Sequence, residues 1–264
     1  MCLVVLAFGS HPGYPLVVTA NRDEFHARPA RDAGWWPDWP DVAGGRDLLA
    51  GGTWLAVHRD GRFATVTNHH DAEPKHANRR SRGELVTGFL QGDAGALDYL
   101  QSIDGNSYDG FNLLVGDRRE LAYLSNQDNE PRTLTPGIYG LANARLDSPC
   151  DKVQRSRKRL QGLLEASQPN DTGLFRLLAD RRRGPVAEAA DKHLPFARAH
   201  ATTAPFIVLP DYGTRCSTIF TVSGDGHAHF RERRFDPAGN SVGETTLEFD
   251  IDRPGLTLSP AVEP

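Results

Sequence analysis

Apolar runs separated by turn-forming residues give the first picture of the fold. The chain opens with the run from Leu3 to Phe8, and a second run begins at Leu16 after the segment Ser10 to Pro15. Valine and leucine favour strands, whereas glycine, proline and serine favour turns. We therefore predict an antiparallel hairpin with strands over 2–9 and 16–22. Its first strand is apolar at successive positions, which indicates that both faces are buried.

Apolar and polar residues alternate less regularly along the rest of the chain. The patterns predict helices over 82–90, 94–100, 151–166 and 174–182. They predict further strands over 51–57, 63–68, 111–116, 121–125, 138–143, 217–222, 227–235 and 245–251. The proline-interrupted segments 23–50 and 184–210 are expected to be irregular. Because strands gather at both ends with helices between them, we predict an α+β fold, with two packed antiparallel sheets and helices outside.

Composition narrows the class of protein. The 264 residues carry a formal net charge of −4, which argues against broad attraction to nucleic acid. The chain has no apolar stretch near the length of about 20 residues that spans a bilayer, so we expect no stable membrane insertion. Three cysteines, at positions 2, 150 and 216, cannot all pair with one another, and we expect a reducing cytoplasm. No internal repeat or shift in composition marks a boundary, so we expect one domain over 1–264.

A cysteine directly after the initiator methionine is the strongest chemical signal. Once Met1 is removed, Cys2 carries both a thiol and a free α-amine, whose ordinary pKa values are about 8.5 and about 7.7–8.0. One residue then supplies a nucleophile and a neighbouring base. The alternative is that Cys2 is a small apolar residue at the start of a strand.

The predicted hairpin places a polar run beside Cys2. If Gly9 and Leu16 close the hairpin, Cys2 lies opposite Asp23, in the segment 21–24 of sequence Asn-Arg-Asp-Glu. Cross-strand neighbours have Cβ atoms about 4.5–5.5 Å apart. We expect Asp23 to hold the α-amine and Arg22 to favour the thiolate.

Alternation along the strand places Arg22 and Glu24 on one face of the sheet, and Asn21 and Asp23 on the other. Asn21 and Glu24 are candidates for binding substrate. Without Cys2 opposite, a solvated strand end would be the simpler interpretation of this run.

Several motifs, taken together, resemble the NRDE family, also called the transport and Golgi organisation protein 2 family. They are Met-Cys at 1–2, Asn-Arg-Asp-Glu-Phe at 21–25, Gly-Gly-Thr-Trp-Leu at 51–55, Thr-Asn at 67–68, Arg-Gly-Glu-Leu at 82–85, Gly-Phe-Asn-Leu at 110–113, Gly-Ile-Tyr-Gly-Leu-Ala-Asn-Ala at 137–144 and Tyr-Gly-Thr-Arg-Cys-Ser-Thr-Ile at 212–219. These landmarks occur in order over nearly the whole chain. Each fragment alone is weak, and their combination makes the resemblance specific.

The resemblance implies an N-terminal-nucleophile hydrolase-like fold, a four-layer αββα sandwich with Cys2 at the mouth of a cleft. The implied reaction is acyl transfer from an amide or thioester to Cys2. Similar cysteine amidohydrolases carry Arg-x-x-Asp where this chain has Asn-Arg-Asp-Glu, so both of their residues map here only after a shift. The alternative that the resemblance implies is a carrier of haem, an acyl-CoA or another lipid in the same cleft.

The comparison with those amidohydrolases also suggests further residues. Asn68 and Asn143 each end a predicted strand, and either side chain can donate an N–H to an oxyanion. Each is equally well explained as a turn-forming strand end. Arg215 is expected either to bind a substrate carboxylate or phosphate or to lie on the surface.

No cofactor or metal site is expected. His227 and His229 share a strand face, but an exposed hairpin pair explains them better than a ligand role. The basic runs at 155–159 and 181–183 lie on or beside predicted helices, which favours solvated faces over nucleic-acid contacts.

Overall fold

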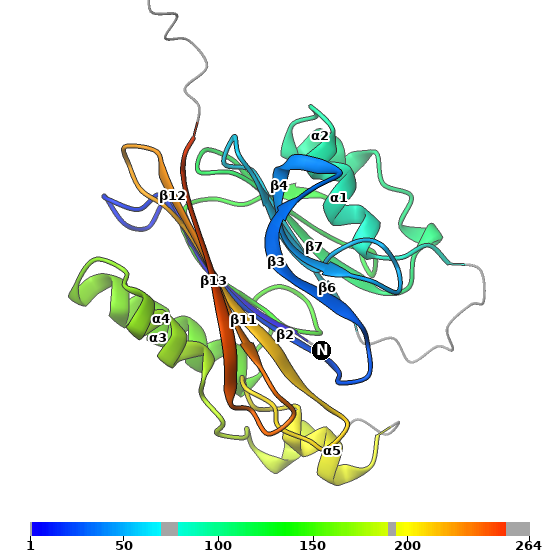
Figure 1. Ribbon diagram of the computed structural model, residues 1–264. Helices are drawn as coiled ribbons and strands as arrows, with labels where there is room; N and C mark the ends of the chain where they lie inside the picture. Colours follow the sequence, from blue (N-terminus) through cyan, green and yellow to red (C-terminus); the bar gives the residue numbers. More distant parts are fainter. Residues whose placement is uncertain (1, 70–78, 190–193, 252–264) are drawn as a thin grey trace, which may run out of the picture.

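The computed structural model describes residues 2–69, 79–189 and 194–251 and contains two antiparallel sheets (Figure 1). The first sheet holds, in spatial order, β10 (Gly137–Leu141), β1 (Cys2–Phe8), β2 (Leu16–Phe25), β11 (Tyr212–Val222), β12 (His227–Phe235) and β13 (Ser241–Asp250). The second holds β3 (Ala30–Trp36), β4 (Trp39–Asp47), β5 (Leu55–His58), β6 (Phe63–Asn68), β7 (Phe111–Gly116), β8 (Leu121–Ser125) and β9 (Arg132–Thr133).

Helices cover the outer face of each sheet (Figure 1). The first sheet is covered by α3 (Asp151–Ala166) and α4 (Asp171–Leu178), and the second by α1 (Gly83–Gln91) and α2 (Ala96–Gln101). Short elements complete the chain, namely α5 (Phe196–Ala201) and the 3-10 turns η1 (Gly105–Ser107) and η2 (Val186–Ala189). The predicted four-layer αββα sandwich is confirmed.

Three apolar clusters hold the layers together. One fills the space between the sheets and includes Val4, Leu6 and Val18. A second lies between the second sheet and its helices. The third includes Leu3 and Val5 and packs the first sheet on α3 and α4. Successive residues of β1 thus enter two different clusters, so the strand is buried on both faces, as its unbroken apolar run predicted.

The expectation of a loop over 23–50 was wrong. Strands β3 and β4 form a hairpin there. Its register shifts twice, which interrupts the alternation of apolar and polar residues that marks a strand. Gly44, with a φ of 159°, also approaches the carbonyl of Leu55 so closely that a side chain there would clash. Prolines, bulges and glycines at close contacts look like loop signals in a sequence.

The first hairpin closes one residue earlier than predicted. Phe8 pairs with Leu16, and the N–H of Gly9 donates to the carbonyl of Pro15 at 2.8 Å. Cys2 consequently lies opposite Arg22 rather than Asp23. A shift of one residue exchanges the two faces of the partner strand, so Arg22 now shares a face with Cys2, and Asp23 does not.

Candidate functional site

Cys2 begins the buried strand β1 and is itself partly exposed. It alternates with Val4 and Leu6, so its side chain faces the space between the sheets. Burial raises the pKa of the Cys2 thiol, and the nearby carboxylate of Asp23 raises it further, while the charge of Arg22 acts in the opposite direction. The thiol is therefore held in its protonated form, with a cation close by that favours ionisation.

A row of side chains crosses the first sheet at the level of Cys2. Arg22 pairs with Cys2 on one side and with Cys216 of β11 on the other. On the far side of β1, the last pair of β10 joins Leu141 to Val4, and Asn143 follows two residues later, past the end of the strand and in the direction of Cys2. The nucleophile candidate thus has an arginine opposite it on β2 and an asparagine just beyond the end of β10.

The Arg22 guanidinium is enclosed by residues of the second sheet. Its carbon lies 4.0 Å from the centre of the Trp54 ring, and one nitrogen lies 3.9 Å from a carboxylate oxygen of Asp47. The side chain is only 5% exposed, yet its guanidinium donates no hydrogen bond to any described residue. Sequence reasoning assigned no role to Trp54 or Asp47. The hydropathy pattern does not indicate that either residue contacts Arg22, because the contact depends on how the two sheets face each other.

Asn143, just past the end of β10, bonds to the second sheet. Its Nδ2 donates to the carbonyl of Asn68 at 2.8 Å, and the hydroxyl of Thr67 donates to the carbonyl of Ala142 at 2.7 Å. The Oδ1 atom of Asn143 is buried and, within the described residues, accepts no hydrogen bond. Asn68 ends β6 and its side chain is exposed. The structure brings Asn68 and Asn143 together, and the role of each as an oxyanion donor stays a prediction.

Asp23 and Asn21 lie on the opposite face of the sheet, toward the helices. Asp23 accepts a hydrogen bond from the Thr214 hydroxyl at 2.7 Å. Burial raises the pKa of the Asp23 carboxyl to about 6, against the opposing charge of Lys152. Asn21 is buried and donates to the carbonyls of Leu178 and Pro205, at 2.9 and 2.8 Å. Its Oδ1 accepts from the Ser217 hydroxyl at 2.6 Å.

Both the nitrogen and the oxygen of the Asn21 amide are therefore used in hydrogen bonds that tie β2 to neighbouring parts of the chain. The predicted role of Asn21 in substrate binding therefore gains no support from its placement.

Glu24 and Arg215 lie near the end of β2. Glu24 accepts a hydrogen bond from the N–H of Phe25 at 2.8 Å. Arg215 donates through one nitrogen to the carbonyls of Phe25, His26 and Arg28, at 3.0 to 3.2 Å. Burial, with the charge of Arg22, lowers the pKa of Arg215. The Arg215 side chain holds the turn after β2, and the predicted anion-binding role remains a prediction.

Comparison with known proteins places the chain among its relatives. A family model described as Transport and Golgi organisation 2 matches residues 1–237. The chain belongs to that family. It is 35% identical over 276 residues to the Transport and Golgi organization protein 2 homolog of Bos taurus, and the match covers 95% of this chain and 99% of the relative. The human homolog is 34% identical over 278 residues, with the same coverage of both chains.

A solved structure outside the Transport and Golgi organisation 2 family shares the fold. It is a mutant of the conjugated bile acid hydrolase from Clostridium perfringens, with a TM-score of 0.53 and 8% identity. The match covers 93% of this chain and 92% of the hydrolase chain. The similarity shows that this member of the family has an N-terminal-nucleophile hydrolase-like fold.

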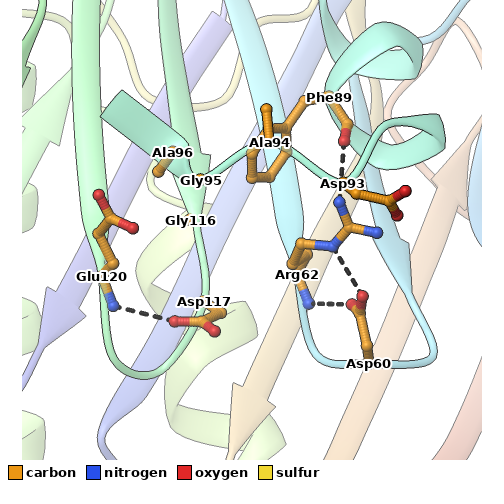
Figure 2. Close-up of a pocket in the computed structure, with 10 residues that line it drawn as sticks. All are labelled: Asp60, Arg62, Phe89, Asp93, Ala94, Gly95, Ala96, Gly116, Asp117 and Glu120. Carbon is orange, nitrogen blue, oxygen red and sulfur yellow. Dashed lines mark hydrogen bonds and ion pairs between the residues drawn. The ribbon is translucent and has the colours of Figure 1, made fainter. Parts of the chain in front are cut away.

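A cavity of about 300 Å³ lies away from Cys2, beside the turn between β5 and β6 (Figure 2). Figure 2 shows Arg62 donating to Asp60 and to the carbonyl of Phe89, and the N–H of Glu120 donating to Asp117. Several residues that line the cavity thus already form hydrogen bonds with one another. The described residues contain no cluster of three histidine, cysteine or acidic side chains suited to a metal ion.

Other features of this family member fall outside the site. His227 pairs with Asp250 at 2.9 Å, and His229 lies 3.2 Å from Asp171, so both histidines belong to surface charge networks. Among the described helices, none is long and apolar enough to cross a membrane. Met1, whose removal would free the α-amine, lies outside the described residues.

Proposed function

We propose that this protein is a cysteine hydrolase of the N-terminal-nucleophile type, which acts on an amide or thioester after removal of Met1. The observation that carries the proposal is that Cys2 begins a buried strand directly opposite Arg22, with Asn143 just past the end of the strand on its other side. A positioned nucleophile with hydrogen-bond donors on neighbouring strands is the arrangement that acyl transfer requires.

The proposed reaction runs through an acyl-enzyme. The α-amine of mature Cys2 takes the thiol proton, and the sulfur attacks the substrate carbonyl carbon. Arg22 stabilises the oxyanion. The bond to the leaving group then breaks, and the leaving group takes the proton from the terminal ammonium. Water next attacks the thioester to release the acid and restore the thiol. Asp23, on the opposite face, is proposed to hold the ammonium form.

The test combines processing and reactivity. Intact mass of the native protein is expected to lack Met1, and a thiol-directed acyl probe is expected to add one acyl group to Cys2. Cys2→Ser and Cys2→Ala should abolish turnover with the fold intact. Cys150→Ser, which changes a partly buried thiol elsewhere, is the matched control and should leave acylation unchanged. Retained Met1 in native protein would contradict the proposal.

A second candidate is a carrier that binds haem, an acyl-CoA or a lipid on the same scaffold. What distinguishes it from the hydrolase is that the raised pKa of the Cys2 thiol keeps the thiol protonated; a protonated thiol is a weak nucleophile, so the scaffold would bind a ligand without turnover. Haemin titration, run beside an acyl-CoA thiol-release assay on one sample, separates the two candidates. Saturable binding without thiol release would support the carrier.

We also propose a cytoplasmic setting. Cys2, Cys150 and Cys216 are free thiols in the structure, as expected for a reducing compartment. Fractionation of cells that express the tagged protein tests this placement, and recovery in a secretory fraction would contradict it.

A further inference from the structure

The two neighbours of Cys2 leave opposite kinds of hydrogen-bonding capacity unused. On the β2 side, the Arg22 guanidinium offers N–H donors, and none of them has an acceptor among the described residues. Beyond the end of β10, the Oδ1 atom of Asn143 is a buried acceptor that has no donor among the described residues. Cys2 lies on β1, opposite Arg22 of β2, and Asn143 follows two residues after the last pair of β10 with β1. Buried polar groups without partners are costly and rare, so the Asn143 oxygen points to a ligand.

The orientation of the Asn143 amide follows from its neighbour. The Nδ2 atom lies 2.8 Å from the carbonyl oxygen of Asn68, which can only accept. The reversed orientation would bring two oxygens together, so the NH₂ group must face Asn68. Oδ1 is then the atom left free. The side chain is only 9% exposed, and so bulk water is a poor substitute for a specific donor.

We propose that this site selects secondary amides over thioesters, with Asn143 Oδ1 as the acceptor for the substrate N–H. The inference rests on the proposed hydrolase function. The carbonyl oxygen of such a substrate accepts from Arg22, its carbonyl carbon lies over the Cys2 sulfur, and its N–H donates to Asn143. A secondary amide carries an acceptor and a donor on adjacent atoms, which matches a donor on the Arg22 side of Cys2 and an acceptor on the Asn143 side. A thioester has the acceptor but no donor.

The chemistry balances without any further reactant. The Cys2 sulfur forms a bond to the carbonyl carbon, and the carbon–nitrogen bond breaks. The nitrogen keeps its hydrogen, still bound to Asn143, and takes a second proton from the terminal ammonium to leave as an amine. The hydrogen bond to Asn143 also fixes the direction of the nitrogen lone pair, so that this pair points toward the ammonium.

The α-amine of mature Cys2 is the competing donor for Oδ1. If the amine fills that position, loss of the acceptor disturbs every substrate alike. If a substrate N–H fills it, loss of the acceptor weakens amide cleavage selectively. The two arrangements therefore predict different ratios of amide to thioester activity.

The test uses probes that share an octanoyl group, namely the para-nitroanilide, its N-methyl derivative and the thioester of para-nitrothiophenol. In Asn143→Leu, the ratio of kcat/KM for the anilide to kcat/KM for the thioester is expected to fall about tenfold or more. Thr67 still ties the strand end to the second sheet in this variant. For the unaltered protein, N-methylation should lower anilide cleavage at least as much, a measurement that needs no mutation.

The outcomes separate the two levels of the proposal. Equal losses for anilide and thioester in Asn143→Leu would overturn the role of Oδ1 and leave the hydrolase function standing. If the N-methyl anilide is cleaved as fast as the anilide itself, the role of Oδ1 is likewise overturned and the hydrolase function stands. If neither the anilide nor the thioester acylates Cys2, the hydrolase function itself fails, and the substrate preference fails with it.

Discussion

Arg22 lies directly opposite Cys2 across the first hairpin, and the same guanidinium lies over the ring of Trp54, the residue directly before β5 of the second sheet. The contact between Arg22 and Trp54 joins the two sheets at the end of the sandwich where the nucleophile candidate lies. Arg22 contacts a ring and a distant carboxylate and donates no hydrogen bond to the part of the chain that the structure describes, so its charge is available to the Cys2 sulfur. The ionisation of Cys2 should therefore respond to small changes around Arg22.

Replacing Arg22 by Gln is expected to slow alkylation of Cys2. Loss of the cation raises the thiol pKa, and the midpoint of the pH profile for iodoacetamide labelling should rise by a fraction of a pH unit. Arg46→Gln is the matched control, since Arg46 also lies over a tryptophan, at 4.6 Å from the Trp36 ring, and pairs with Asp38. A profile shifted equally in both variants would contradict a specific effect of Arg22.

Replacing Asp47 by Asn should lower the pKa of the Cys2 thiol, the opposite of the effect expected for Arg22→Gln. Asp47 shares its carboxylate between Arg28, at 2.7 Å, and Arg22, at 3.9 Å. Without that negative charge, Arg22 stabilises the thiolate more strongly, and the labelling midpoint should fall by a fraction of a pH unit. Asparagine keeps an oxygen for the N–H groups of Leu49 and Ala50, so the turn is preserved.

The control for this substitution is Asp38→Asn, which removes a carboxylate of the same hairpin that pairs with Arg46. Its labelling profile should match that of the unaltered protein. An upward shift in Asp47→Asn would overturn the assigned sign.

Asp23 should make the stability of the protein depend on pH. Burial raises its folded-state pKa to about 6, above the value of about 3.9 in an unfolded chain. The folded protein binds the proton more tightly, so this contribution is present below about pH 4 and is lost as the pH rises through 6. It amounts to about 3 kcal/mol.

The isosteric variant Asp23→Asn lacks this titration. Its free energy of unfolding, relative to the unaltered protein, should rise between pH 4 and pH 7 in urea denaturation. Parallel pH profiles for the two proteins would show that the Asp23 carboxyl does not titrate in this range.

Gly45 should be required for the placement of Trp54. A Cβ atom there would lie 2.3 Å from Cη2 of the Trp54 ring, so Gly45→Ala forces the ring to move. Overpacking of this kind costs about 1–3 kcal/mol. Thermal denaturation should show this loss, and Trp54→Leu should reduce it in the double variant. Gly34→Ala on the neighbouring strand meets no atom within 4 Å, and a similar loss there would argue against the clash.

Much of the fold could be predicted from the sequence. The unbroken apolar run of β1 indicated a central strand, and the helical periodicity over 151–166 matches α3. The hairpin of β3 and β4 was missed because its bulges and glycines follow no simple period. The region of α5 was expected to be irregular, since its short helix gives little periodic signal.

The site was predicted in part. The hairpin correctly brought Cys2 beside the segment 21–24, but the register was off by one residue, and that error reversed which side chain faces the thiol. The contacts of Arg22 with Trp54 and Asp47 were not predicted, because each of these residues lies more than 20 residues from Arg22 in the sequence and in or beside the other sheet.

The sequence by itself determined that a cysteine follows Met1 and begins a buried strand, because these depend only on position and local periodicity. It also determined that polar residues end the neighbouring strand. Only the tertiary structure decided that Arg22, and not Asp23, shares the face of Cys2, and that the buried Oδ1 of Asn143 accepts no hydrogen bond from any described residue. Such relationships depend on strand register and on the packing of two sheets, which no local pattern of residues specifies.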